Sequence, residues 1–192
     1  LFVQCAKRGN PTGGPKDETP PVLLRADPEL NTTHFNEERI RLYFDEYVKL
    51  KKLKDQLIVS PPLDPAAYII SPQSAAAKYV QIELMDTLRP NTTYNFNFGQ
   101  SIVDNNEGNP YPYFRYVFST GDYVDSLQVR GTIGNAFGRE TKNFVSVMLY
   151  AVDSTYNDSI IYQQPPDYLT NTLDSLEVFE IGNVKAGRYL LI

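Results

Sequence analysis

Apolar and polar side chains alternate along a series of short runs between residues 20 and 121. The runs are RIRLYFDEYV, YVQIEL, YNFNFG and YFRYVFST, and turn residues such as Pro, Asn and Gly lie between them. The apolar face of these runs collects Ile40, Leu42, Phe44, Val80, Ile82, Leu84, Tyr94, Phe96, Phe98, Phe114, Tyr116 and Phe118. A repeat of two with β-branched and aromatic residues is typical of antiparallel strands with one buried face. The chain is therefore predicted to be all-β and to form antiparallel β-sandwiches.

The same alternation predicts which side chains face solvent. Asn95 and Asn97 fall between the apolar positions of YNFNFG, so we expect them on the solvent face. Only YVKLKKLKDQL, at residues 47–57, could form a helix, and its length limits that helix to a turn or two.

The connection LRPNTTY, which precedes the run YNFNFG, has a more specific pattern. It places Leu88, Pro90, Thr92 and Tyr94 at alternate positions. This spacing resembles the tyrosine corner of fibronectin-type and related Ig-like sandwiches, in which a tyrosine at the start of a strand bonds back to the backbone. An ordinary Pro-Asn turn is the alternative.

Residues 19–121 carry an ordered set of short segments. These are TPPVLLRADPE, RLYFDEYVKL, LIVSPP, LRPNTTYNFNF and SIVDNNEGNPYPYFRYVFSTGD. Their order resembles that of bacterial Ig-like domains, with a PP-V start, a D-x-x-x-G-N loop and a final F-[ST]-T strand. The resemblance implies an Ig-like β-sandwich over residues 19–121.

Residues 122–192 show a different pattern and are expected to form a second sandwich. LQVRGTIGNAF and NFVSVMLYAVD read as two strands separated by a turn at Gly138, and SLEVFEIGNVKAGRYLLI reads as another pair around Lys185–Gly187. The order of these segments resembles transthyretin-like and carboxypeptidase-regulatory-like domains. Because the chain stops within an apolar strand at Leu190–Ile192, we expect this second sandwich to be incomplete and the protein to continue.

Residues 1–18 precede these domains and contain Cys5, the single cysteine of the chain. A stray free thiol and a catalytic thiol are two interpretations, and the second lacks a nearby base because the only histidine is His34. The third is lipidation, since LFVQC resembles the end of a secretory signal followed by the lipobox of bacterial lipoproteins. The Cys-Ala-x-Arg-Gly start and the PTGGPKD segment resemble lipoproteins of Bacteroidota. This resemblance implies a diacylglycerol on Cys5, a flexible tether from Gly9 to Pro15 and attachment to the outer membrane.

Composition and motifs exclude several functions. The net charge of −5 gives no support to nucleic-acid binding, and no apolar stretch approaches the length of a membrane span. One cysteine and one histidine cannot build a zinc site, and no nucleophile-elbow, P-loop or metalloprotease motif is present. The loop DNNEGN, at residues 104–109, lacks the EF-hand spacing and is interpreted as a turn rather than a calcium site. We therefore expect no catalytic residue, no metal and no cofactor beyond the acyl group on Cys5.

Two surface features could contact a partner. The first is the lysine run, which consists of Lys49, Lys51, Lys52 and Lys54. The second is the segment NPYPYFRYVF, in which Tyr111, Tyr113 and Arg115 are expected to face outward as interface anchors. A solvated strand edge is the alternative for the lysines, and coverage of the sandwich rim is the alternative for the tyrosines.

These observations favour a non-catalytic, lipid-anchored protein of the cell envelope that serves as a scaffold for protein–protein contacts. The lipoprotein resemblance implies an accessory subunit of an outer-membrane assembly, for protein export or β-barrel insertion, with an integral outer-membrane protein as its partner. Surface-exported lipoproteins of the resembled group tend to carry acidic residues soon after the cysteine, whereas here Lys7 and Arg8 come first, so the resemblance implies the periplasmic face. The alternative is a glycan-binding module, which requires Tyr111, Tyr113 and Tyr116 to form a flat exposed platform.

Overall fold

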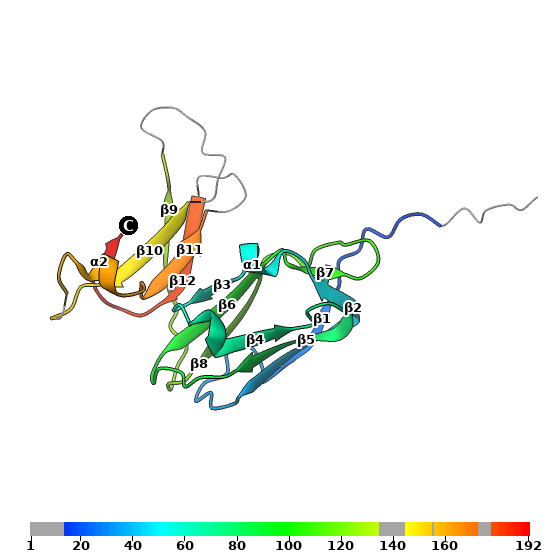
Figure 1. Cartoon of the computed structure of the whole chain (residues 1–192), viewed down its shortest axis with the longest axis horizontal. Helices are drawn as coiled ribbons and strands as arrows, with labels where there is room; N and C mark the ends of the chain where they lie inside the picture. Colours follow the sequence, from blue (N-terminus) through cyan, green and yellow to red (C-terminus); the bar gives the residue numbers. More distant parts are fainter. Residues whose placement is uncertain (1–13, 135–144, 155, 173–177) are drawn as a thin grey trace, which may run out of the picture.

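The computed structural model describes residues 14–134, 145–154, 156–172 and 178–192 (Figure 1). Its regular structure is almost entirely antiparallel strands, so the predicted all-β class is confirmed. The helical elements are α1 (Leu53–Gln56), α2 (Ile160–Gln163) and a 3-10 turn, η1 (Pro65–Ala67). Helix α1 is the single turn that the run at residues 47–57 allows.

Two sheets form the N-terminal sandwich. The strands of the first sheet follow the order β1-β2-β5-β4, and β7 pairs with the far end of β2. Their bounds are β1 (Leu23–Asp27), β2 (Arg39–Leu50), β4 (Tyr68–Ser71), β5 (Ala77–Leu84) and β7 (Ile102–Asp104). The second sheet has the order β3-β6-β8, with bounds β3 (Ile58–Ser60), β6 (Thr93–Gly99) and β8 (Phe114–Ser119).

The apolar positions of the alternating runs meet between these two sheets, as the period of two predicts. Ile40, Leu42, Val80 and Ile82 of the first sheet are completely buried. An aromatic cluster is centred on Phe118: Tyr94, Phe96, Tyr116 and Phe118 come from the second sheet, and Phe35 comes from the connection between β1 and β2. Burial of this much apolar and aromatic surface is the main source of stability of the sandwich.

The described residues of the C-terminal unit form five further strands in two small sheets. The sheet orders are β11-β10-β13 and β12-β9. The bounds are β9 (Leu127–Thr132), β10 (Ser146–Ala151), β11 (Tyr168–Asn171), β12 (Val178–Val184) and β13 (Tyr189–Leu191). Strands β12 and β13 are the two strands expected around Lys185–Gly187, but they join different sheets instead of pairing with each other. The turn expected at Gly138 lies outside the described residues.

A small apolar core lies between the two sheets of the C-terminal unit. It contains Val147, Leu149, Tyr168, Phe179, Ile181 and Val184. Gly131 of β9 lies opposite Phe179 of β12, and a Cβ atom at residue 131 would come within 2.6 Å of the Phe179 ring. The ring therefore packs directly on the glycine backbone, which explains the glycine at this strand position.

A candidate interaction cleft between the two units

The C-terminal unit rests on the outer face of the β3-β6-β8 sheet, where β11 lies beside β3 and β12 beside β6 (Figure 1). The amide of Asn95 on β6 donates to the side-chain oxygen of Asn183 at 3.2 Å, and Asn183 donates to the carbonyl of Asp125 at 2.9 Å. Asn95 is only 7% exposed. The prediction that Asn95 faces solvent is therefore wrong: the side chain points away from the core of its own sandwich, but the second unit covers it.

Glu180 of β12 forms one ion pair across the two units and a second within its own unit. Its carboxylate lies 3.1 Å from Arg115 of β8 and 2.9 Å from Arg130 of β9. Burial alone would raise the pKa of Glu180, but the two guanidinium groups outweigh that effect and hold the pKa below its usual value. Arg115 was expected to face outward as a partner contact. The structure instead uses it within the molecule, because Glu180 is brought against it by the packing of β12 on β6.

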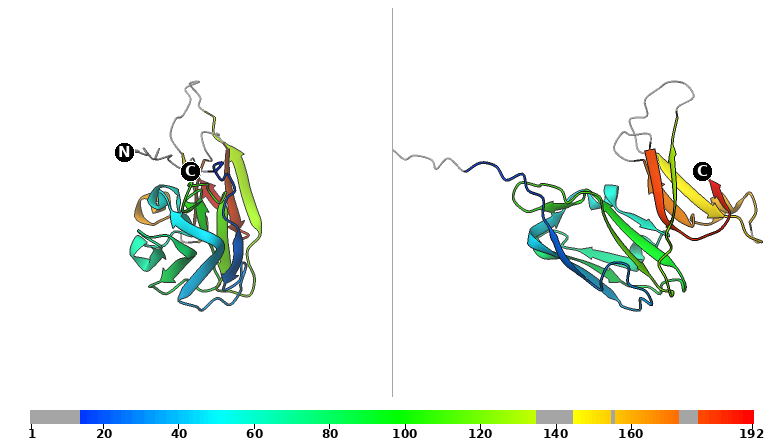
Figure 2. Two further views of the ribbon diagram at one scale, coloured as in Figure 1. Left: turned by 90° about the vertical axis from the view of Figure 1, so that its right-hand side faces the viewer. Right: turned by 180° about the vertical axis from the view of Figure 1, so that it is seen from behind.

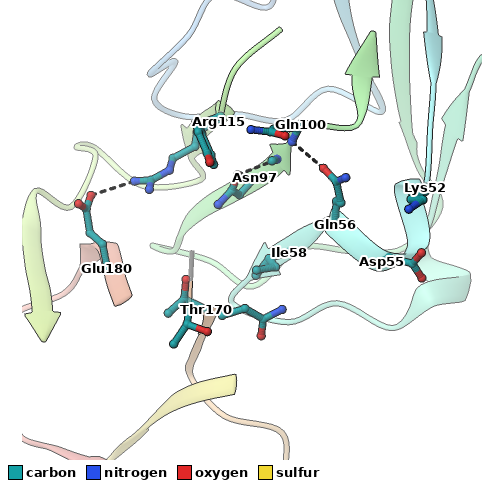
Figure 3. Close-up of a pocket in the computed structure, with 13 residues that line it drawn as sticks. Lys52, Asp55, Gln56, Ile58, Asn97, Gln100, Arg115, Thr170 and Glu180 are labelled. Carbon is teal, nitrogen blue, oxygen red and sulfur yellow. Dashed lines mark hydrogen bonds and ion pairs between the residues drawn. The ribbon is translucent and has the colours of Figure 1, made fainter. Parts of the chain in front are cut away.

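A cleft of about 500 Å³ opens beside this ion pair (Figure 3). Its walls come from α1, β3, β6 and the start of β8 on one side and from β11 and β12 on the other. Most of the lining residues have polar side chains, among them Gln56, Asn97, Gln100 and Thr170, but the larger part of the exposed lining surface is apolar. The lining contains two positive residues, Lys52 and Arg115, and two negative residues, Asp55 and Glu180, so it carries no net charge. Such a lining suits the polar groups of a polypeptide better than it suits a strongly charged ligand.

Local interactions fix the wall of the cleft near α1. The side-chain oxygen of Gln56 accepts the backbone N–H of Gln100 at 2.6 Å, and the side-chain oxygen of Asn97 accepts the N–H of Gly99 at 3.0 Å (Figure 3). Lys52 and Tyr113 both adopt left-handed backbone, with φ of 51° and 47°. Left-handed residues other than glycine are uncommon, and they cluster at functional sites.

The two surface features identified separately in the sequence meet at this cleft. Lys52 comes from the lysine run, while Tyr113 and Arg115 come from the segment before β8, and all three side chains contribute to the lining. Lys49, Lys51 and Lys54 are exposed but lie outside the lining. The cleft therefore combines one lysine of the run with the exposed part of the Tyr/Arg segment.

The other tyrosines of that segment do not form an exposed platform. Tyr116 is completely buried, and its hydroxyl donates to the carbonyl of Pro28 at 2.9 Å. Tyr111 was expected to face outward, but it packs against the core, with its ring centroid 5.7 Å from that of Phe44 in an edge-on arrangement. Tyr113, at 45% exposed, is the one tyrosine of this segment that the structure describes as exposed. The flat platform that the glycan-binding alternative requires is therefore contradicted by the structure.

A hydrogen bond of the Tyr94 hydroxyl stabilises the connection at residues 88–94, which leads into β6. Tyr94 is completely buried and its hydroxyl accepts the backbone N–H of Arg89 at 2.9 Å. Thr92 donates its hydroxyl to the carbonyl of Pro90 at 2.9 Å, and Leu88 packs against the core. These contacts hold the start of β6 and hence the strand that carries Asn95 and Asn97.

The loop at residues 104–109 is organised by a single carboxylate. The Oδ1 atom of Asp104 accepts the N–H groups of Asn106, Glu107 and Gly108, and its Oδ2 atom accepts that of Asn109 at 2.6 Å. All of its acceptor capacity is directed into the loop, which is the role of a structural turn. Among the described residues, no three His, Cys, Asp or Glu side chains gather as a metal site would need.

Sequence reasoning missed several residues of the cleft and its ion pairs, namely Gln56, Arg130, Thr170, Glu180 and Asn183. Each lies at an ordinary polar position of a strand, helix or turn, and its role follows from contacts with residues that are distant in the sequence. The only signal was Arg115 within an aromatic strand, whose charge needed a partner.

A double-mutant cycle tests the ion pair between the units. The cycle compares the variants Arg115→Ala and Glu180→Ala with the double variant by urea unfolding. It should give a coupling free energy of about 1 kcal/mol, because both side chains are mostly buried. The matched pair Arg39 and Glu83, 3.6 Å apart and more exposed, should give less than about half of that. Equal coupling in the two cycles would contradict the structural role of Glu180.

Comparison with known protein families places the N-terminal sandwich in a family. A model described as the bacterial Ig-like domain matches residues 17–120, which are more than half of the chain and include the whole N-terminal sandwich. No curated protein and no solved structure matches the chain. None of the described helices is long and apolar enough to cross a membrane.

Proposed function

Because the chain belongs to the bacterial Ig-like domain family, whose members are generally structural and non-enzymatic, we propose that it is a lipid-anchored interaction module of the cell envelope. In this proposal it is an accessory subunit of an outer-membrane assembly, such as one for protein export or β-barrel insertion. Cys5 carries the acyl anchor, and the cleft between the two units receives an envelope protein.

The observation that carries the proposal is the convergence of Lys52, Tyr113 and Arg115 on one cleft. Tyrosine and arginine are the residue types that are enriched at protein–protein interfaces, and Tyr113 and Arg115 bring both to this cleft. The Ig-like fold by itself implies no particular partner. The cleft therefore supplies the part of the argument that the family membership does not.

The position of the N-terminal segment supports the anchor. The segment leaves the sandwich at the end opposite the C-terminal unit (Figure 2). The side-chain amide of Asn109 bonds to the carbonyls of Asp17 and Thr19, at 3.0 and 3.3 Å, and so fixes the point of departure. A flexible tether from Cys5 to this point would span about 20 Å. An anchor at Cys5 would thus hold the C-terminal unit and the cleft away from the bilayer surface.

Metabolic labelling with an alkyne fatty acid tests the anchor in the native host. We expect the tagged full-length protein to be labelled and membrane-bound, and Cys5→Ala to lose both properties. Thr12→Ala, in the same segment, is the matched control and should behave as the wild type. Labelling that persists in Cys5→Ala would contradict lipidation at this residue.

Extraction in a mild detergent, with mass spectrometry of the proteins that co-purify, tests the subunit role. Stoichiometric recovery of an integral outer-membrane protein is expected, and a variant carrying both Lys52→Ala and Tyr113→Ala should reduce that recovery. Tyr162→Ala is the control, because Tyr162 is 86% exposed on α2 and outside the cleft lining. Recovery of a lipidated protein without any partner would contradict the subunit role.

A further inference from the structure

The outer face of the β1-β2-β5 part of the first sheet carries an unusual group of side chains. We call it the arginine–tyrosine face and define it as Arg25, Arg41, Tyr43, Tyr79 and Gln81. The strand register places Arg25 opposite Tyr43, Tyr43 opposite Tyr79, and Arg41 opposite Gln81. This sheet is the one that the C-terminal unit does not cover, so the face is separate from the cleft (Figure 1).

Neighbouring groups hold one another in place on this face. The guanidinium carbon of Arg25 lies 3.8 Å from the centre of the Tyr43 ring, and that ring lies 5.9 Å from the ring of Tyr79. The guanidinium carbon of Arg41 lies 5.7 Å from the centre of the Tyr79 ring, and its Nε donates to the side-chain oxygen of Gln81 at 2.9 Å. The two guanidinium groups are therefore preorganised, which lowers the entropy cost of binding a ligand.

The face offers hydrogen-bond donors that make no direct ion pair, although Asp27 lies opposite Arg41 in the strand register. A guanidinium group has five donors and no acceptor. Within the described part of the chain, neither Arg25 nor Arg41 has a carboxylate at ion-pair distance, whereas Arg39 on the same sheet pairs with Glu83. Two unpaired cations side by side are notable in a chain of net charge −5. The chemistry that complements them is a set of carboxylates.

We propose that the arginine–tyrosine face binds an acidic, extended polypeptide segment of another protein. Arg25 and Arg41 are diagonal neighbours on adjacent strands, a relation that separates the backbone positions of the two side chains by about 7–8 Å. Alternate side chains of an extended peptide are about 7 Å apart. Two carboxylates at positions i and i+2 of such a segment can therefore each take one guanidinium group in a forked pair.

Two features favour a polypeptide over other ligands. The rings of Tyr43 and Tyr79 already contact each other and a guanidinium group, so they offer little free ring face for a sugar. The carboxylates of Asp27 and Glu83 belong to the same sheet face and would repel a continuous anionic surface such as a lipid bilayer. A peptide, in contrast, can place its separate carboxylates at Arg25 and Arg41 and keep them away from Asp27 and Glu83.

Fluorescence anisotropy with the full chain tests this proposal with a labelled eight-residue peptide, (Glu-Ser)4. We expect binding that weakens with salt, and affinity for the (Gln-Ser)4 peptide at least about tenfold lower. A variant with both Arg25→Gln and Arg41→Gln should also lose about tenfold or more. A variant with both Arg89→Gln and Arg188→Gln, which removes the same charge elsewhere, should bind as the wild type does.

Three results would overturn the proposal. These are equal binding of the two peptides, equal loss in the two double variants, and arginine-dependent flotation with vesicles in place of peptide binding. The vesicles consist of one part phosphatidylglycerol and three parts phosphatidylethanolamine. Thermal unfolding of each variant checks that the fold is intact. Because neither Cys5 nor the cleft takes part in this assay, its outcome is independent of the proposed anchor and subunit role.

Discussion

Replacing Phe118 by alanine is expected to destabilise the protein by about 4 kcal/mol. The Phe118 ring is completely buried at the centre of the aromatic cluster, 4.0 Å from the ring of Phe35 and 5.5 Å from that of Tyr94, measured between centroids. Alanine would leave a cavity between the two sheets and remove all of these ring contacts. Urea unfolding followed by far-UV circular dichroism measures the loss.

Two further variants separate cavity formation from the loss of an aromatic ring. Phe118→Leu keeps most of the apolar volume and should cost about 1–2 kcal/mol. Leu24→Ala removes an apolar side chain that is 65% exposed, and its effect should be within about 0.5 kcal/mol. A similar loss for the leucine and alanine variants of Phe118 would contradict the packing described here.

Replacing Asp104 by alanine is expected to cost about 3 kcal/mol, because four backbone N–H groups would lose their shared acceptor. The carboxylate is 1% exposed, so water cannot easily take its place. Asp64 is the matched control: it is exposed and accepts one N–H group, that of Ala66, so Asp64→Ala should cost about 1 kcal/mol or less. Equal losses at the two positions would contradict the role given to Asp104.

The contribution of Asp104 should also depend on pH. Burial alone would raise the pKa of Asp104, but the four N–H donors together outweigh it and hold the pKa below its ordinary value. A carboxyl group whose pKa is lower in the folded state stabilises the fold fully above its unfolded pKa of about 3.9. That contribution is lost as the pH falls through the folded pKa. The stability difference between the wild type and Asp104→Asn should therefore be constant near neutral pH and shrink in strong acid.

The core of the N-terminal sandwich could be predicted from the sequence because a strand has a strict period of two. Ile40, Val80 and Phe98 are buried where the alternation places them. The burial of Asn95 could not be predicted in this way. Periodicity tells which side chains point away from their own core, but it does not tell whether another unit covers that face.

The interactions at the cleft were predicted only in part, for a related reason. Lys52 and Tyr113 were identified by their local composition, yet nothing in either segment indicates that they line one cleft with Thr170. Arg115 was predicted on the correct side of β8, but its partner Glu180 lies on a strand of the other unit. Contacts of this kind depend on how the two units pack, and a single sequence carries no local signal for that.

The expected exposure of Tyr111 failed for a local reason. The residue lies in the Pro-rich approach to β8, outside the strand, so the alternation does not fix its direction. Its ring lies 5.6 Å from that of Phe114 and covers the edge of the core. Coverage of the sandwich rim was the alternative interpretation for these tyrosines, and it holds for Tyr111.

Photocrosslinking in intact cells tests most directly whether the cleft is the contact surface for an envelope partner. Tyr113 is replaced by benzoylphenylalanine in the full-length protein, and Tyr162 is replaced in the same way as the exposed control. The proposal predicts a discrete adduct between residue 113 and an envelope protein, with no such adduct at residue 162. The same adducts at both positions, or none at residue 113 with a stably folded protein, would contradict it.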